Sequence, residues 1–389
     1  MRIAFIGQKG IPTVAGGVEK HVEEVATRMA KMGHEVFVYV RNNYTDRNLS
    51  EFHGVKLIHL PSISSKNLDA ISHTFLATIH ALFCTYDVIH YQAIGPTSLA
   101  WIPKLLKRKT VVVATFHCQD YYHQKWGKFA QAYLKFGEWV AAHVPDKTIT
   151  VSHILKDYVA KKYGCEAMYI PNGAGVQQTE KTDALKQWDL TEGRYILIVS
   201  RLIRHKGVHY AIETFKQLQD TSRMPNNFKL VIVGDGFYTD EYVGYLKRIS
   251  EKRPNIVFAG SQGGETLAQL FSHAYLFVQP SESEGLSLSL LESMGCGVAP
   301  LVSDIDENME AIQGCGFSFR SKDVQDLKEK MAYLLNRPNE VISVGRAAKV
   351  LAEREYSWES IARKTLGVYE DAVALKHELN TYVWKSKKA

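Results

Sequence analysis

Residues 195–207 read YILIVSRLIRHKG, and this stretch decides the fold. Its first five residues form a continuous apolar run, which is typical of a strand buried on both faces of a sheet. Basic residues follow at once, and an amphipathic segment begins after Gly207. A strand, a short polar loop and a helix in this order predict the start of a parallel α/β unit.

The same alternation extends in both directions along the chain, and it predicts parallel sheets with helices on both faces. Strands are expected at residues 2–7, 35–40, 55–60, 87–92, 110–117, 147–152 and 167–171, and again at 195–200, 229–234, 255–259, 275–279, 298–303 and 316–319. A helix is expected over residues 18–32, and Gly33 is its expected stop.

The polar stretch between the two strand series indicates a linker. We therefore expect an α/β chain of two tandem Rossmann-like, doubly wound domains, at residues 1–175 and 194–356, with the linker at 176–193. A helical segment at 357–389, which ends in a basic tail, is expected to pack back on the N-terminal domain. Ligands of such sheets bind beyond the carboxyl ends of the strands, so we expect a site in the cleft between the domains.

Composition narrows the class of protein. Among 389 residues, 46% are hydrophobic and 23% are charged, which excludes a disordered or fibrous chain. No apolar run approaches the roughly 18 residues that cross a bilayer, and five scattered cysteines without a CxxC pair argue against disulfides or zinc. We expect a cytoplasmic protein. The net charge of +6 suits an anionic small substrate or membrane surface, and no nucleic-acid-binding signature is present.

Three loops that follow predicted strands carry residue types suited to binding an anion. Residues 7–19 read GQKGIPTVAGGVE, which is neither GxGxxG nor a P-loop. Gly16 and Gly17 allow close approach of backbone to a phosphate at a helix start, although a turn that needs a positive φ explains them equally well. The basic loop of the stretch 195–207 carries Arg201, Arg204 and Lys206. These cations suit the binding of a diphosphate, and the alternative is a solvated loop without a ligand.

The third loop, residues 281–295, reads SESEGLSLSLLESMG. Glu284 is expected before a helix and Glu292 two turns inside it, so the two carboxylates would mark opposite ends of one ligand. The amides of residues 285–287 would face an anion between them. An acidic first helical turn also explains Glu284, but it leaves Glu292 unexplained in a mostly apolar helix.

Together these motifs resemble glycosyltransferase family 4. The motifs that carry the resemblance are Gly16-Gly17, Ile170-Pro171-Asn172-Gly173, Ser200-Arg201-Leu202 with Lys206-Gly207, Gly234-Asp235-Gly236, and Glu284 with Glu292 after seven intervening residues. They occur in order over nearly the whole chain. The opening IGQKGIP at 6–12 is similar to a subgroup of bacterial rhamnosyltransferases and other polysaccharide-building enzymes. The resemblance implies a GT-B fold and a retaining, metal-independent enzyme without a cofactor.

The resemblance also implies roles for individual residues. The expected donor-binding residues are Gly16, Gly17, Arg201, Lys206, Gly234, Gly260, Ser261, Glu284, Gly285, Leu286, Ser287 and Glu292, and the expected catalytic residues are His117, Glu284, Arg201 and Lys206. Arg201 and Lys206 would hold the diphosphate, and Glu292 would bind the ribose hydroxyls. His117 would lie near the reacting sugar. For Glu284, roles as a nucleophile and as a group that positions the sugar are both open.

The implied reaction transfers a hexose from a UDP, GDP or dTDP sugar to a hydroxyl of a saccharide or lipid-linked acceptor, in the synthesis of a cell-surface polysaccharide or glycolipid. Two other classes stay open: a sugar-nucleotide epimerase of related two-domain fold, and a non-catalytic protein that binds nucleotide sugars. A phosphorylase is a further alternative, and it would need a pyridoxal-bearing lysine.

Two further stretches each have two interpretations. Asp304-Ile305-Asp306 stands where many relatives have Asp-x-Gly-Gly, and it resembles the DxD metal motif of the other glycosyltransferase fold. We favour an N-terminal cap for a helix near residues 307–312 over a metal site. Residues 101–109 read WIPKLLKRK, which suits contact with the inner face of an anionic membrane. We favour a helix that packs on its sheet and leaves its lysines solvated.

Overall fold

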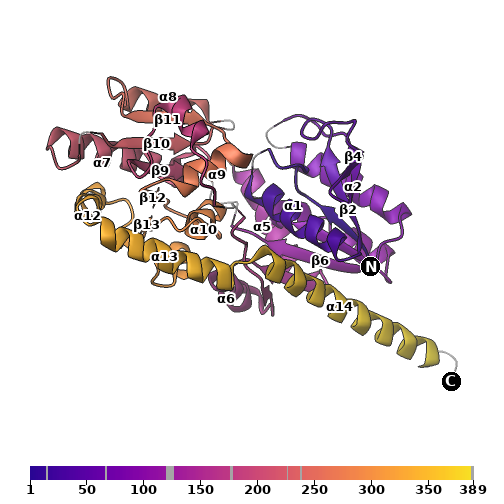
Figure 1. Cartoon of the computed structure of the whole chain (residues 1–389). Helices are drawn as coiled ribbons and strands as arrows, with labels where there is room; N and C mark the ends of the chain where they lie inside the picture. The colour runs from indigo at the N-terminus through magenta and orange to yellow at the C-terminus, as the bar shows by residue number, and fades with distance from the viewer. Residues whose placement is uncertain are drawn as a thin grey trace. The chain divides into compact units, whose positions relative to one another are not determined.

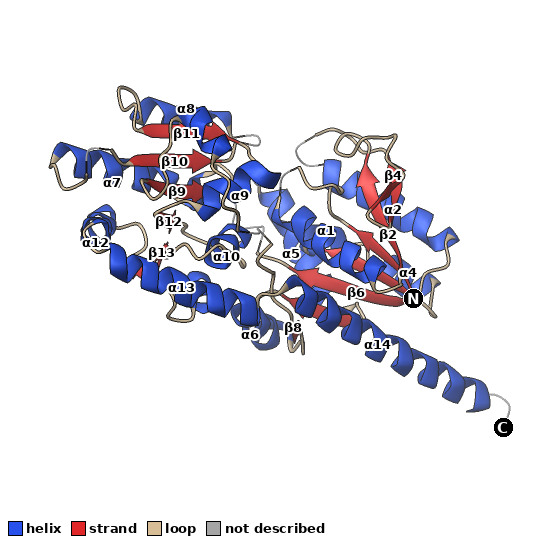
Figure 2. Cartoon of the chain, in the orientation of Figure 1, coloured by secondary structure: helices blue, strands red, loops and turns tan. Residues whose placement is uncertain are grey.

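The computed structural model describes residues 1–14, 16–65, 68–119, 127–175, 178–225, 227–236 and 239–386, with side chains described as far as residue 378. These residues form two compact units, Met1–Asn172 with Trp358–Ala389, and Gly173–Ser357. Figures 1 and 2 show a sheet covered by helices in each unit. The α/β class and the doubly wound sheets expected from the sequence are confirmed.

The first unit contains an eight-stranded sheet in the order β3-β4-β2-β1-β5-β6-β7-β8, in which only the β3–β4 pair is antiparallel. Its elements are β1 (Arg2–Ile6), α1 (Gly17–Lys31), β2 (Glu35–Arg41), β3 (Glu51–Phe52), β4 (Val55–Leu60), α2 (Asp69–Phe83), β5 (Val88–Gln92), α3 (Ile94–Thr97), α4 (Trp101–Leu106), β6 (Val111–Phe116), α5 (Lys128–His143), β7 (Lys147–Thr150), α6 (His153–Tyr163), β8 (Met168–Tyr169) and α14 (Trp358–Ser386).

The direction of the chain through this sheet reverses at β1. Ile3 of β1 pairs with Val36 of β2 on one side and with Val88 of β5 on the other. The crossover from β1 to β2 runs one way along the sheet. The crossovers from β4 to β5, from β5 to β6 and from β6 to β7 run the other way. Because such crossovers are right-handed, α1 covers one face and α2, α3, α4 and α5 cover the other.

The second unit contains a six-stranded parallel sheet in the order β11-β10-β9-β12-β13-β14. Its elements are η2 (Asp183–Trp188), β9 (Tyr195–Val199), η3 (Arg204–Lys206), α7 (Val208–Asp220), β10 (Lys229–Val233), α8 (Asp240–Ile249), β11 (Ile256–Gly260), α9 (Gly264–Ser272), β12 (Leu276–Gln279), α10 (Leu288–Gly295), β13 (Pro300–Ser303), α11 (Asp306–Ile312), β14 (Phe317–Phe319), α12 (Val324–Leu335) and α13 (Pro338–Glu355). Here the order reverses between β9 and β12, and ligands of such sheets bind at this switch point.

Residues 176–193 were expected to form a linker, but the described part of this stretch is packed within the second unit. Residues 178–193 belong to the second unit, where Leu185 is buried within η2. The backbone N–H of Thr179 donates to Ser272 Oγ at 3.0 Å, and that of Ala184 donates to Gln269 Oε1 at 2.8 Å. Polar residues that suggested a solvated segment therefore bind α9. Residues 176 and 177 of the expected linker, and 387–389 of the basic tail, lie outside the described residues.

The chain returns to the first unit after Ser357, and α14 packs against α1 and β6. The Tyr369 hydroxyl lies 2.5 Å from Nδ1 of His90 on β5. Lys376 Nζ forms an ion pair with Asp146 at 2.8 Å and donates to the Thr110 carbonyl at 2.7 Å. Within the residues described, no helix is both long and apolar enough to cross a membrane.

Candidate functional site

The loops that follow β9 and β12 are joined at the switch point of the second sheet. Gly207 adopts φ +67°, and a Cβ there would lie 1.9 Å from the Pro280 carbonyl oxygen. The backbone N–H of Glu282 donates to the His205 carbonyl at 2.7 Å. Only glycine fits this contact, because any side chain would collide with backbone. The basic loop and the acidic loop are therefore held against each other by their main chains.

This contact brings Lys206 and Glu284 together. Lys206 Nζ lies 2.5 Å from Glu284 Oε2, and the two side chains are only 15% and 6% exposed. The other carboxylate oxygen, Oε1, is buried and has no hydrogen-bond partner among the described residues. A buried oxygen without a donor costs free energy, and a hydroxyl group of a bound ligand is a donor that would satisfy it.

Arg201 lies beyond the end of β9, in the same basic loop. Its side chain is exposed, and no hydrogen bond or ion pair joins its guanidinium to any part of the chain that the structure describes. The backbone on its C-terminal side is anchored, since Leu202 N–H donates to the Asp235 carbonyl at 2.9 Å. Arg201 is thus a cation on a positioned backbone, able to bind an anion.

A buried polar network that the sequence analysis missed holds the start of α10. Ser287 Oγ donates to Gln279 Oε1 at 2.7 Å, and Gln279 Nε2 donates to Asn308 Oδ1 at 2.6 Å. Asn308 Nδ2 in turn donates to the Ser303 carbonyl at 3.0 Å. The available signal was Gln279 itself, an amide at the end of the apolar strand β12. The network joins β12, α10 and α11 beside the loop that carries Glu284.

The helix that carries Glu292 begins later than expected. Ser287 is its N-cap, and its side chain accepts a hydrogen bond from Leu290 N–H, so α10 starts at Leu288. Gly285 and Leu286 consequently precede the helix, and the buried Glu292 lies about one turn inside it rather than two. The expectation placed the helix start too early because the serine cap was not recognised.

Two glycines end neighbouring strands at this edge. Gly234 has φ +129°, and a Cβ there would lie 1.9 Å from the Ser200 carbonyl oxygen. Its N–H donates to the Gly260 carbonyl at 2.8 Å. Gly260 has φ +68° and open space around it, and Ser261 after it is exposed. Close packing of the β9 and β10 ends therefore requires glycine at 234.

In the first unit, His117 follows β6 within a buried group of histidines. His117 Nε2 lies 2.8 Å from Gln92 Oε1, and the rings of His117 and His21 meet edge to face at 5.0 Å. Burial lowers the pKa of His117 well below its ordinary value, and the nearby His21 and His90 lower it further. Burial also lowers the pKa of His21 to about 4. His117 is therefore neutral near pH 7, and its ring can take part in hydrogen bonds, as it does with Gln92.

The glycine loop after β1 folds around Glu19. Gly16 has φ +115° and precedes Gly17, the first residue of α1. Glu19 Oε1 accepts a hydrogen bond from Lys9 N–H at 3.0 Å, and a Cβ at Gly16 would lie 1.9 Å from Glu19 Oε2. The positive φ that the turn interpretation required is present at Gly16.

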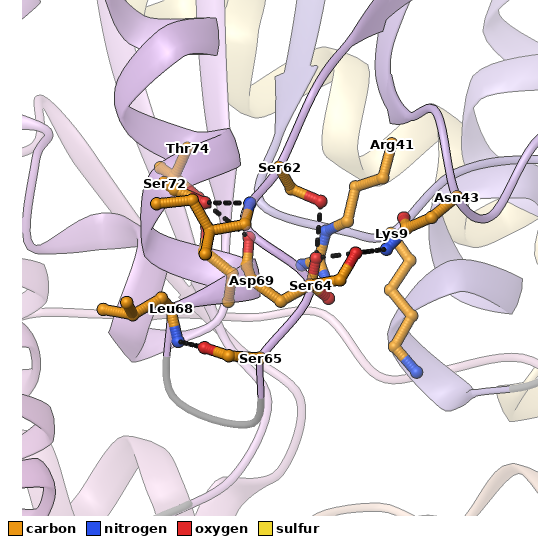
Figure 3. Close-up of polar contacts among 12 residues, drawn as sticks. Lys9, Arg41, Asn43, Ser62, Ser64, Ser65, Leu68, Asp69, Ser72 and Thr74 are labelled. Carbon is orange, nitrogen blue, oxygen red and sulfur yellow. Dashed lines mark hydrogen bonds and ion pairs between the residues drawn. The ribbon is translucent and has the colours of Figure 1, made fainter.

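A second polar cluster that the sequence analysis missed lies at the carboxyl ends of β2 and β4 (Figure 3). Arg41 Nη1 lies 2.5 Å from Asp69 Oδ2, and Ser62 Oγ donates to Asp69 Oδ1 at 2.6 Å. Partial burial opposes ionisation of Asp69, but the bonds from Ser62 and Arg41 outweigh it and lower its pKa. Lys9 and the exposed Asn43 lie beside this pair. The cluster presents polar groups at the ligand-binding edge of the first sheet.

The expected cap at Asp304–Asp306 is wrong in detail. The helix α11 begins at Asp306, and its N-cap, Ile305, makes no side-chain cap. Asp304 Oδ1 instead accepts a hydrogen bond from Ser321 N–H at 2.8 Å. Over the described ranges of the chain, no group of three or more His, Cys, Asp or Glu side chains is arranged to hold a metal ion.

Comparison with known proteins gives matches along nearly the whole chain. The model of glycosyltransferase family 4 matches residues 15–178, and that of glycosyl transferases group 1 matches residues 180–371. An α-monoglucosyldiacylglycerol synthase of Streptococcus pneumoniae is 26% identical over 76% of this chain and 70% of its own. An uncharacterized glycosyltransferase of Methanocaldococcus jannaschii is 24% identical over 96% of this chain and 99% of its own.

Solved structures show the same fold. HepE of Anabaena, in complex with UDP and glucose, matches with a TM-score of 0.79 at 18% identity, over 95% of this chain and 100% of its own. Sucrose-phosphate synthase of Thermosynechococcus elongatus matches with a TM-score of 0.78 at 20% identity, over 96% and 99% of the two chains.

Proposed function

Since this chain belongs to the family 4 glycosyltransferases, we propose that it transfers a hexose from a nucleotide-diphosphate sugar to an acceptor hydroxyl, with retention of the anomeric configuration. The observation that carries this proposal is the Lys206–Glu284 pair at the switch point of the second sheet, where Lys206 follows β9 in the same loop as Arg201. It combines cations suited to a diphosphate with a buried carboxylate oxygen suited to a sugar hydroxyl.

In this proposal, catalysis is mainly electrostatic. Negative charge grows on the diphosphate as its bond to the sugar breaks, and Arg201 and Lys206 would stabilise that charge. Each such contact contributes about 2–4 kcal/mol, by analogy with the loss of one oxyanion donor. Glu284 Oε1 would accept a hydrogen bond from the sugar and so orient its reacting carbon. We favour attack from the same face, with the leaving phosphate taking the acceptor's proton.

We propose that no resident metal ion or cofactor takes part, because two cationic side chains already supply the charge that a metal would otherwise provide. Undiminished turnover after treatment with EDTA is the expected result. The configuration of the product, followed by proton NMR from the first turnovers, tests retention. An inverted product, or loss of turnover that Mg²⁺ or Mn²⁺ restores, would contradict these two parts of the proposal.

For the substrates, we propose a UDP, GDP or dTDP sugar and a saccharide or lipid-linked acceptor. HepE is described in complex with UDP and glucose, and one relative is named as a synthase of a monoglucosyldiacylglycerol. The polar cluster of Arg41 and Asp69 would contact acceptor hydroxyls, since it lies at the carboxyl edge of the sheet that we assign to the acceptor. The neutral His117 would add a hydrogen bond near the reacting sugar.

The test is a panel of nucleotide diphosphates and their sugars. A nucleotide at about 100 times its Kd stabilises the protein by about 2.7 kcal/mol, which a thermal-shift assay detects. The Arg201→Ala variant should lose this stabilisation, whereas Arg204→Ala, a matched loss of charge from the same loop, should retain it. Incubation of the preferred donor alone should release nucleotide without forming an epimer. An epimeric sugar nucleotide, or binding without any turnover or hydrolysis, would refute the proposal.

A further inference from the structure

Three helices of the first unit expose large apolar side chains to solvent. On α2, Phe75, Leu76 and Phe83 are exposed, and Phe83 is 87% exposed. Their spacing of one and then seven residues places them on one side of the helix. A side chain as large as phenylalanine is seldom this exposed on a surface that contacts only water.

The other two helices repeat this arrangement. On α4, Trp101, Leu105 and Leu106 are exposed. On α5, Phe129, Phe136 and Trp139 are exposed, and Phe129 is 88% exposed. The spacing of seven and then three residues places these aromatic side chains on one stripe of α5. The Trp139 ring stacks on Phe136 and on His143.

All three stripes lie on one side of the unit. The helices α2, α4 and α5 belong to crossovers that run in the same direction, so they cover the same face of the sheet, opposite α1 and α14. Neighbouring contacts connect them, since α2 packs against α3 and α4, and α3 packs against α5. We call the nine exposed side chains on this side the apolar face; they are Phe75, Leu76, Phe83, Trp101, Leu105, Leu106, Phe129, Phe136 and Trp139.

The two carboxylates on these helices are paired and largely buried, whereas several of their cations are exposed. The two carboxylates of α2, α4 and α5 are Asp69, which pairs with Arg41, and Glu138. The Glu138 side chain has no exposed surface and binds Lys162 at 2.8 Å. The exposed charged residues on or next to these helices in the sequence are one carboxylate, Asp87, and four cations, Arg108, Lys109, Lys128 and Lys135. The face is therefore apolar, aromatic and positively charged.

We infer that the apolar face docks on the surface of an anionic lipid bilayer. Aromatic and leucine side chains would enter the boundary between headgroups and acyl chains, while lysine and arginine would meet anionic headgroups. A second copy of this chain is a poorer partner. In a two-fold dimer the face would pack on itself, which would bring cations against cations without an exposed carboxylate on these helices to pair with them.

The inference extends beyond the WIPKLLKRK stretch, for which we favoured a helix with solvated lysines. That helix, α4, does bury Ile102 and Pro103, and Lys104 pairs with Asp146 at 2.6 Å. The same helix exposes Trp101, Leu105 and Leu106. That the enzyme would meet its acceptor at the membrane rests on the proposed function. The docking itself can be measured without any transfer reaction.

The experiment is co-sedimentation of the full chain with large vesicles of phosphatidylcholine, alone or with an equal amount of phosphatidylglycerol. We expect at least tenfold stronger binding to the anionic vesicles, and weaker binding in 0.5 M salt. The variant Phe83→Ser with Phe129→Ser should reduce binding at least tenfold, as should Arg108→Glu with Lys109→Glu. The control variant Ile342→Ser with Val350→Ser changes two exposed residues of α13 in the second unit and should bind as the parent chain does.

The outcomes separate the two proposals. Loss of vesicle binding with unchanged transfer to a water-soluble acceptor supports the docking face. Equal binding to both kinds of vesicle, or undiminished binding by the Phe83 and Phe129 variant, overturns it. A concentration-dependent dimer that the same variant abolishes also overturns it, because the face would then belong to a second copy. If no donor supports transfer while anionic vesicles still bind, the proposed function fails and the docking face stands.

Discussion

Replacement of Lys206 by alanine tests the central contact of the site. The lysine is the partner of Glu284 Oε2 at 2.5 Å, and Glu284 Oε1 has no partner in the described structure. Without the lysine, neither oxygen of a carboxylate that is only 6% exposed would have a partner. Removal of one partner of a buried pair costs about 3–5 kcal/mol of stability. Loss of a contact to the departing diphosphate raises the barrier by about 2.7–4 kcal/mol, which lowers turnover ~10²–10³-fold.

Paired variants separate these two effects. Steady-state kinetics and urea unfolding are measured for Lys206→Ala, Glu284→Gln and the double variant Lys206→Met with Glu284→Gln. The double variant removes both charges, so most of the lost stability should return. Its turnover should stay low, because the diphosphate still lacks its cation. Lys216→Ala, at a lysine that pairs with Glu213 on α7, serves as the control and should change neither quantity much.

Two results would refute this reasoning. Near-normal turnover in Lys206→Ala, with nucleotide affinity unchanged, would remove the assignment of Lys206 to the diphosphate. Recovery of turnover in the double variant would show that Lys206 serves only as the counter-ion of Glu284.

Three further predictions follow from particular contacts. Gly207→Ala should lower the free energy of unfolding by at least about 2 kcal/mol through strain and a backbone collision, whereas Gly260→Ala, at a similar φ but in open space, should cost about 1 kcal/mol; equal losses in urea unfolding would contradict this. His21 and His73, each with a pKa of about 4 in the folded chain, are neutral there but take up protons below pH 6.5 when unfolded. Stability should therefore be full above pH 6.5 and fall toward pH 4, by about 3 kcal/mol for each histidine, and a flat profile of denaturant midpoints over this range would refute it. Asn308→Ala should lower the free energy of unfolding by about 1–3 kcal/mol, because Gln279 and the Ser303 carbonyl would lose a buried hydrogen-bond partner. It should also lower kcat more than it raises KM for the donor. An unchanged kcat would show that the network does not position the Glu284 loop.

Much of the fold could be predicted from local pattern. Continuous apolar runs such as residues 195–199 identify buried parallel strands, because such strands contact helices on both faces. Polar and glycine residues directly after those runs identify the carboxyl edge of each sheet. The residues of the candidate site therefore stood out before any tertiary contact was known, and the family resemblance supplied the roles we assign to them.

Capping and packing of polar segments were harder to predict. The start of α10 depends on Ser287 as its N-cap. Residues 178–193 pack on α9 because Ser272 and Gln269 of that helix accept hydrogen bonds from their backbone. A polar side chain looks the same in a sequence whether its partner is water or a distant backbone group. The composition of residues 178–193 therefore predicts a solvated linker, and only the fold shows that α9 is their partner.

By itself, the sequence determined two doubly wound α/β units and the loops that carry Arg201, Lys206 and Glu284. Only the tertiary structure decided that Lys206 and Glu284, 78 residues apart, form a pair, because that requires β9 and β12 to be neighbours and glycine at 207 to let their loops touch. It likewise decided which stripe of α2 and α5 meets solvent. Helical periodicity defines a stripe, whereas the direction of each crossover determines which side the sheet covers.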